Sequence, residues 1–253
     1  MTPNARPVDS FSFWQKLSDQ HIRVAGGTAL LQPHVPLLLA NAVWQPEVDK
    51  LAAVRNVYEP HGIQAGVVVT DANESLEQAL IQHSYSPEMQ FAVSPLNSQT
   101  PSAQQRAADI ARFTADDCVI EQVSWTESGR IGEVLAMGYD YLTYSTTLGI
   151  LLAQALQDQP HLQAYLAFSS EAVDEPPEGA MLTHPYEGSL RALMLAGKPQ
   201  AQQALTKRLQ TEAAELDVVA ELLEYQATPQ ASTTSPSVFQ GASQTFTYWG
   251  QQT

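Results

Sequence analysis

The hydrophobic pattern of the second half of the chain predicts an alternation of strands and helices. A strand over residues 118–125 is followed by two helices, 127–144 and 147–157. Pro199 stands where a long helix to about residue 215 begins, a position at which proline is well tolerated. The other predicted strands are 163–168, 180–183, 189–195, 218–225 and, as an edge strand, 246–249, with 184–188 closing a hairpin.

The first half shows a related but shorter pattern. Residues 21–31 alternate loosely around Gly26 and Gly27, which predicts a strand with a bend. Residues 95–103 are rich in Ser, Pro, Gln and Asn and read as a linker. Before the linker we expect a buried strand over 36–43, a helix from Pro46 to about Tyr58, a strand over 63–70, a helix over 74–83 and a strand over 89–93.

Both halves therefore contain an apolar strand, a helix opened by proline and a second buried strand. A repeat on this scale indicates duplicated domains rather than a solenoid. We expect an α/β (α+β) protein of two halves, residues 1–103 and 104–253, with a mixed, mostly antiparallel sheet flanked by helices.

Composition narrows the range of functions. Hydrophobic residues make up 44% of the 253, enough for a full core, and 12 Lys and Arg against 27 Asp and Glu give a net charge of −15. Such a chain repels phosphate backbones, so no nucleic-acid partner is expected. Cys118 is the only cysteine and the six histidines show no ligand spacing, so we expect no metal site. We also expect no signal peptide, no membrane span and a cytoplasmic location, because the apolar runs are short.

The order of elements over residues 118–249 resembles the GNAT superfamily of N-acetyltransferases. In that family a strand, two helices, three antiparallel strands, a long helix and a further strand follow one another. The first half resembles a truncated copy of the same fold. The resemblance implies two tandem GNAT-like halves and transfer of an acetyl group from acetyl-CoA to an amine of a small molecule or peptide. It also implies that the strands 189–195 and 218–225 splay apart.

The family's phosphate-binding motif, Arg/Gln-x-x-Gly-x-Gly/Ala, precedes the long helix. One alignment of residues 195–202 puts Gly197 at the Arg/Gln position and Gln200 and Gln202 at the small-residue positions. A shift of three residues puts Gly197 at the glycine position and Pro199 at the second small-residue position. Neither alignment restores the motif, so the cofactor loop is degenerate. Lys198 is its only cation and replaces some of the lost attraction for phosphate. An ordinary turn before a helix is the alternative. By resemblance, the residues that contact acetyl-CoA are Leu193, Leu195, Gly197, Lys198, Gln200, Ala201 and Gln202.

The expected hairpin between two strands supplies the candidate catalytic residues. His184 and Glu187 are candidate bases and Tyr186 is a candidate acid; the alternative is a solvent-exposed polar loop, since loops are polar in any case. Where the family often has a tyrosine acid, this chain has Phe239, which cannot donate a proton. Two functions follow: acyl transfer from acetyl-CoA to an amine, or a non-catalytic binding protein that keeps the GNAT fold.

Overall fold

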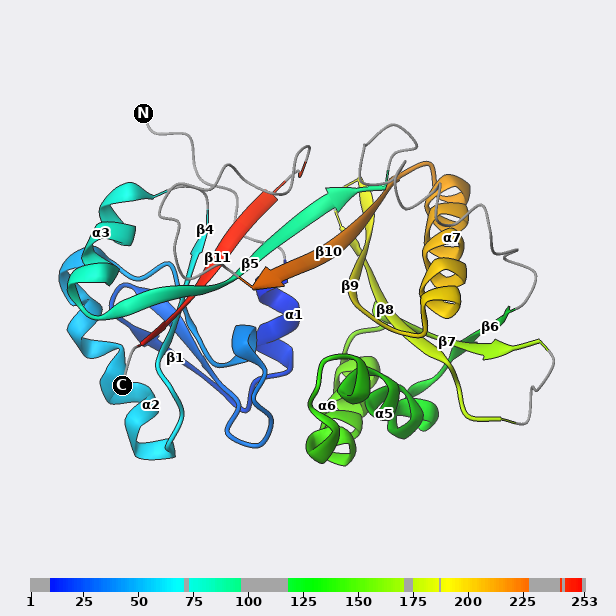
Figure 1. The fold of residues 1–253 in the computed structure, drawn as a ribbon, viewed down its shortest axis with the longest axis horizontal. Helices are drawn as coiled ribbons and strands as arrows, with labels where there is room; N and C mark the ends of the chain where they lie inside the picture. The colour runs from blue at the N-terminus through cyan, green and yellow to red at the C-terminus, as the bar shows by residue number, and fades with distance from the viewer. Residues whose placement is uncertain are drawn as a thin grey trace. The chain divides into compact units, whose positions relative to one another are not determined.

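A computed structural model describes residues 10–70, 73–96, 118–170, 175–186, 188–227, 242 and 244–251. The chain forms two compact units (Figure 1). Unit 1 comprises residues 1–92, 224–238 and 244–253, and unit 2 comprises residues 93–223 and 239–243. Two long strands, β5 (Tyr85–Pro95) and β10 (Val219–Ala227), contribute residues to both units.

Unit 1 is a mixed sheet in which the strands follow the order β1-β2-β3-β4-β11-β5. Its helical segments are α1 (Ser10–Lys16), α2 (Arg55–Tyr58), α3 (Glu74–Gln82) and the 3-10 turns η1 (Leu38–Ala40), η2 (Val48–Ala53) and η3 (Glu59–His61). The strands not yet given are β1 (Gln20–Val24), β2 (Gly27–Leu31), β3 (Val43–Trp44), β4 (Gly66–Thr70) and β11 (Gln244–Gln251). The strand predicted over 63–70 and the helix predicted over 74–83 are confirmed.

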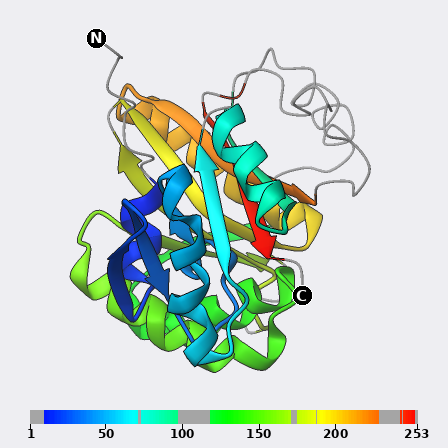
Figure 2. The same ribbon diagram turned by 90° about the vertical axis from the view of Figure 1, so that its left-hand side faces the viewer.

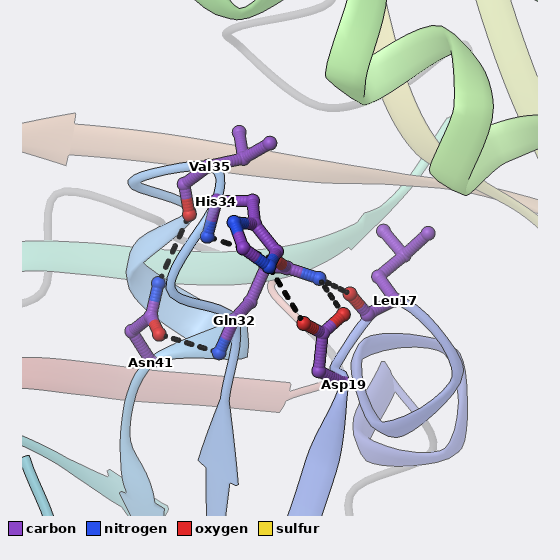
Figure 3. A network of polar contacts seen from close by, with 6 residues as sticks. All are labelled: Leu17, Asp19, Gln32, His34, Val35 and Asn41. Carbon is purple, nitrogen blue, oxygen red and sulfur yellow. Dashed lines mark hydrogen bonds and ion pairs between the residues drawn. The ribbon is translucent and has the colours of Figure 1, made fainter. Parts of the chain in front are cut away.

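The prediction of a continuous buried strand over 36–43 is wrong. The segment holds η1 and only the two-residue strand β3. Asn41 explains the difference, because its side chain accepts the Gln32 N–H (2.7 Å) and donates to the Val35 carbonyl (Figure 3). The same side chain also donates to the Leu37 carbonyl. Gln32 in turn donates to the Leu17 carbonyl at 2.8 Å. These buried polar groups are satisfied by a folded loop and not by a strand.

Two further expectations for unit 1 need correction. The segment after Pro46 is not one helix, since η2, α2 and η3 follow one another as short pieces. Residues 21–31 are not a bent strand but the antiparallel hairpin β1–β2, which turns at Ala25 (φ 52°) and Gly26 (φ 77°). Two consecutive residues with positive φ fit the right-handed twist of a hairpin better than a bend within one strand does.

Unit 2 follows the predicted order of elements closely. Its strands run in the order β10-β9-β8-β7-β6, and all neighbours are antiparallel except β9 and β10, which are parallel. Its strands besides β10 are β6 (Cys118–Val123), β7 (Gln163–Ser169), β8 (Gly179–Tyr186) and β9 (Ser189–Gly197). Its helical segments are η5 (Trp125–Glu127), α5 (Ser128–Gly138), η6 (Leu142–Tyr144), α6 (Ser145–Asp158) and α7 (Pro199–Glu215).

The helices of unit 2 cover both faces of its sheet. Leu195 packs with the buried residues of α7, such as Leu205 and Leu209. The next residue, Ala196, points the other way, since a Cβ added to Gly138 at the end of α5 would lie 2.4 Å from the Ala196 Cβ. Side chains that alternate along β9 therefore meet α7 on one face and α5 on the other.

The C-terminal strand β11 corrects the predicted organisation. The sequence placed residues 246–249 as an edge strand of the second half, but β11 lies between β4 and β5 in unit 1. It runs antiparallel to β4 (Figure 2). In this pairing Phe246 lies opposite Thr70. Phe246 is 2% exposed and its ring stacks on Phe91 at 5.1 Å, as expected for an inner strand. The predicted boundary at residue 103 lies outside the described residues.

The described residues lack two features that would indicate a membrane or metal-dependent function. None of the helices there is long and apolar enough to cross a membrane. The same residues contain no group of three or more His, Cys, Asp or Glu side chains arranged to hold a metal ion.

Candidate active site

The parallel ladder between β9 and β10 is short. Its four residue pairs run from Ser189 opposite Val219 to Ala192 opposite Leu222. β9 continues for five residues past Ala192, and among the described residues none of these five is paired with β10. We call residues 193–197 the open edge of β9. Within the part of the chain that the structure describes, β10 does not pair with these five residues, so it leaves their backbone groups on that side available.

A β-bulge begins the open edge. On β8, Leu182 lies opposite Met194 and Thr183 lies opposite Ala192, so Leu193 has no residue of its own opposite it. A bulge bends its strand and increases the local twist, and bulges are frequent beside active sites. The bulge at Leu193 therefore comes directly after Ala192, the last residue of β9 that pairs with β10.

Tyr139 contacts the open edge of β9. The Leu195 N–H donates to the Tyr139 hydroxyl at 3.2 Å. Tyr139 is the C-cap of α5, and the close packing of Gly138 on Ala196 brings this end of the helix against β9. One backbone N–H of the open edge thus donates its hydrogen bond to a side chain and not to a neighbouring strand.

The loop between β9 and α7 is tight. Gly197 has φ +129°, and a Cβ there would lie 2.2 Å from the carbonyl oxygen of Glu178. Lys198 is the N-cap of α7 and Pro199 is its first residue, without an N–H to donate. The Gln202 side chain folds back and donates to the Gly197 carbonyl at 2.8 Å. The loop is thus closed on itself by its own polar groups.

Two other predicted cofactor contacts differ in their surroundings. Gln200 is exposed at the start of α7. Ala201 is completely buried, and a Cβ added to Gly179 on β8 would lie 2.7 Å from its side chain. The Ala201 methyl therefore belongs to the core beneath α7, and only its backbone can serve a ligand.

Lys198 forms an ion pair across this loop. Its Nζ lies 2.6 Å from Glu178 Oε1, and its backbone N–H donates to the Glu178 carbonyl at 2.8 Å. The hydrogen bond with the Glu178 carboxylate raises the pKa of Lys198. Attraction of phosphate by Lys198 remains a prediction, and a carboxylate already competes for that ammonium group.

Arg191 and Glu221 form a buried ion pair where β9 and β10 are still paired. The Arg191 guanidinium donates to Glu221 Oε2 from Nε at 3.1 Å and from Nη2 at 2.8 Å. Both residues are at least 93% buried, with 5% and 7% of their surface exposed. The Tyr186 ring lies under the guanidinium, 5.4 Å from centroid to Cζ. The ion pair therefore joins β9 and β10 within their four-residue ladder, where Arg191 lies opposite Glu221.

Two of the predicted catalytic residues, His184 and Tyr186, lie on strand β8 and not in a loop. β8 runs to Tyr186 and β9 starts at Ser189, so residues 184–186 of the expected loop are strand residues. His184 lies opposite Arg191, two residues before the bulge. Burial of the imidazole is the main cause that lowers the pKa of His184, and the charges of His161 and Arg191 add to it. Glu187 and Phe239 lie outside the described residues.

Several residues of the site were not singled out from the sequence. Arg191 is the one charged residue of an otherwise apolar strand, and Glu221 lies in a second apolar strand. Opposite charges in two such strands are a sequence signal for an ion pair. The contact of the Tyr139 hydroxyl with the Leu195 N–H joins residues 56 positions apart, and no local sequence pattern predicts it. Nothing in the sequence distinguishes Glu178 from the other residues of its turn.

Comparison with known proteins supports the fold. No protein-family profile and no curated protein sequence matches the chain. A GCN5-related N-acetyltransferase from Kribbella flavida superposes with a TM-score of 0.56 at 12% identity, over 96% of this chain and 94% of that one. The fold is GNAT-like. A protein from Staphylococcus epidermidis described as functionally unknown gives 0.52 at 9% identity, over 91% and 92% of the two chains.

A third GNAT-like structure covers less of the protein. A GCN5-related N-acetyltransferase from Sphaerobacter thermophilus gives a TM-score of 0.50 at 13% identity, over 75% of this chain and 59% of that one. Such low identities show a shared fold and not a shared activity. The tandem relation of the two halves of the GNAT-like chain remains a prediction.

Proposed function

We propose that unit 2 is an N-acyltransferase module that binds an acetyl thioester, acetyl-CoA, along the open edge of β9 and transfers its acetyl group to an amine. The observation that carries the proposal is the end of the β9–β10 ladder at Ala192, followed by five residues of β9 that are not paired with β10. An extended strand edge binds an amide-containing chain through main-chain hydrogen bonds, as an added strand would.

The thioester arm of acetyl-CoA suits such an edge because it contains two amide groups and is extended. When bound, acetyl-CoA supplies the activated acetyl group. The backbone N–H groups near the bulge at Leu193 are the donors available to polarise a carbonyl oxygen, which favours attack on it. Binding at Leu195 requires the Tyr139 hydroxyl to give up the amide that it now accepts.

The acceptor must reach the site as a neutral amine. A lowered pKa keeps the His184 imidazole neutral at pH 7, and a neutral imidazole accepts a proton from an ammonium group. Tyr186 provides a hydroxyl on the same strand that can return a proton to a thiolate. The acceptor that we propose is an amine of a small molecule or peptide, and the net charge of −15 favours a cationic one.

The other end of acetyl-CoA fits less well. Its pyrophosphate would lie at the start of α7, where Pro199 has no N–H and the carboxylate of Glu178 holds Lys198. This observation favours a second candidate function, a non-catalytic protein that uses the GNAT fold to bind another ligand.

The test uses S-acetylpantetheine, which carries the thioester arm without the pyrophosphate and nucleotide. We expect calorimetric titration to show that it binds the full-length protein, and release of free thiol to follow when a panel of amines is added. Tyr139→Phe should strengthen binding about three- to tenfold, because the Leu195 amide is then no longer hydrogen-bonded to a side chain.

Tyr144→Phe is the matched control, because this substitution also removes one phenolic hydroxyl but does so at an exposed residue. It should leave binding unchanged. Binding without thiol release for any amine would favour the non-catalytic candidate. No binding of S-acetylpantetheine to either the wild type or the Tyr139→Phe variant would refute the proposed use of the open edge.

A further inference from the structure

Glu178 stands at the entrance to α7 and is held there by the backbone. The Lys198 N–H donates to its carbonyl at 2.8 Å, and its own N–H donates to the Ala167 carbonyl at 2.8 Å. Gly197 packs so closely on the Glu178 carbonyl that no side chain fits between them. The main chain of Glu178 is therefore fixed against the loop that precedes the helix.

The Glu178 carboxylate reaches the only cation of this loop. Glu178 Oε1 lies 2.6 Å from Lys198 Nζ, and the Glu178 side chain is 20% exposed. Glu175 adds a second negative charge close enough to raise the pKa of Lys198 further. Two carboxylates against one ammonium group leave the entrance with a net negative charge, which opposes the binding of an anion.

The helix start offers little to compensate for this charge. Pro199 has no N–H, and the Gln202 N–H donates to the Lys198 carbonyl at 3.0 Å. The Gln202 side chain covers the Gly197 carbonyl. Only the amides of Gln200 and Ala201 remain, and Ala201 is fully buried. A pyrophosphate would thus meet few donors and a carboxylate.

We infer that Glu178 determines donor specificity by closing the start of α7 to pyrophosphate, so that a donor is held by its thioester arm and not by its nucleotide. This inference rests on the proposed function. Acetyl-CoA and S-acetylpantetheine should therefore bind the wild-type protein with affinities that agree within about threefold. Lys198→Ala in the wild-type background should change acetyl-CoA binding less than about twofold, since the ammonium is already paired.

The decisive variant is Glu178→Gln, which keeps the shape of the side chain and removes its charge. Calorimetric titration at fixed ionic strength should show acetyl-CoA binding about tenfold more tightly than to the wild type, or about 1.4 kcal/mol. S-acetylpantetheine affinity should stay the same. Adding Lys198→Ala to Glu178→Gln should remove the gain, because the freed ammonium is what attracts the phosphates.

The matched control is Glu127→Gln, which changes the net charge equally but lies in the exposed Arg130–Glu127 ion pair. It should give no gain. The inference is overturned if the Glu178→Gln variant binds acetyl-CoA with the wild-type affinity. It is overturned equally if this variant shows no detectable acetyl-CoA binding. It is also overturned if wild type already binds acetyl-CoA tenfold more tightly than S-acetylpantetheine. Failure of the proposed function is separate, since it appears as the absence of S-acetylpantetheine binding.

Discussion

Arg191 and Glu221 show how much a single buried charge matters in this protein. Both side chains are at least 90% buried, and the guanidinium makes two hydrogen bonds to one carboxylate oxygen. Removing one partner leaves the other charge buried without its counterion. We expect Glu221→Ala to lower the free energy of unfolding by about 3–5 kcal/mol, measured by denaturant titration.

The double variant Arg191→Met/Glu221→Leu separates the cost of a lone charge from lost packing. Replacing both charges by apolar side chains should restore most of the stability, because desolvation of the ions offsets much of their attraction. Glu127→Ala, in an exposed ion pair, should change the stability by less than about 0.5 kcal/mol. A loss as small as this for Glu221→Ala would contradict the buried pair.

His184 gives a second prediction at the scale of the residue, this time for pH. Burial holds the pKa of His184 below its ordinary value of 6.5. The unfolded chain therefore binds more protons than the folded chain between the lowered pKa and 6.5, so stability falls as the pH decreases through this window. We expect denaturation midpoints of the wild type to drop more between pH 7.5 and 5 than those of His184→Gln.

His83→Gln is the comparison for this pH series. His83 is exposed at the end of α3, so its replacement should leave the pH dependence of the wild type in place. Identical pH profiles for the wild type and His184→Gln would show that His184 does not contribute to the slope.

Individual residues also show which parts of the site the sequence can predict and which it cannot. Gly197 could be singled out because a glycine before a helix has a local conformational meaning. Glu178 could not, because its importance comes from Lys198, twenty residues away along the chain. Which charged side chain pairs with which depends on the register of β8 with β9, and single residues do not encode that register.

At the scale of elements, the loop between β9 and α7 depends on Gly197. Its φ of +129° is a conformation that L side chains rarely adopt, and a Cβ would collide with the Glu178 carbonyl. We expect Gly197→Ala to destabilise unit 2 by more than 2 kcal/mol, roughly the strain of the backbone plus the clash. Hydrogen exchange should show the largest loss of protection at the start of α7.

Gly188 is a suitable control for this variant. It also has a positive φ, of 79°, but a Cβ there would meet nothing within 4 Å. Gly188→Ala should therefore cost only the backbone strain, about 1 kcal/mol. Equal losses for the two variants would mean that the contact with Glu178 contributes nothing.

Elements with a local signature were predictable and those shaped by distant partners were not. The long helix α7 begins at Pro199 as expected, and the buried strands β4 and β7 follow apolar runs. Residues 36–43 look equally apolar, yet they fold into a loop around Asn41. The buried amides of Asn41 and Gln32 outweigh the apolar pattern because each must be hydrogen-bonded.

At the scale of the whole molecule, the sequence predicted the order of the elements, but it predicted only part of the pairing between strands. The succession from β6 to β10 matches the expected GNAT-like order, because neighbouring elements in sequence pair with one another. β11 breaks this rule, since its partner β4 precedes it by more than 170 residues. A short apolar strand at a chain end carries no information about which sheet it joins.

The position of β11 predicts that the end of the chain holds unit 1 together. Five residues of β11 pair with β4, and Phe246, Tyr248 and Trp249 are at least 95% buried. Deletion of residues 244–253 removes this inner strand and exposes the β4 edge. We expect hydrogen exchange to show loss of protection in β4 while β7 in unit 2 keeps its protection.

Point variants make the same prediction without shortening the chain. Phe246→Ala removes a ring that stacks on Phe91 and lies 5.7 Å from Trp44, so it should cost about 3–5 kcal/mol in the unfolding of unit 1. Gln244→Ala, at the half-exposed start of the same strand, should have little effect. If β4 stays protected after the deletion and after Phe246→Ala, unit 1 does not depend on β11. Parallel loss of protection in β4 and β7 would instead mean that the two units unfold together.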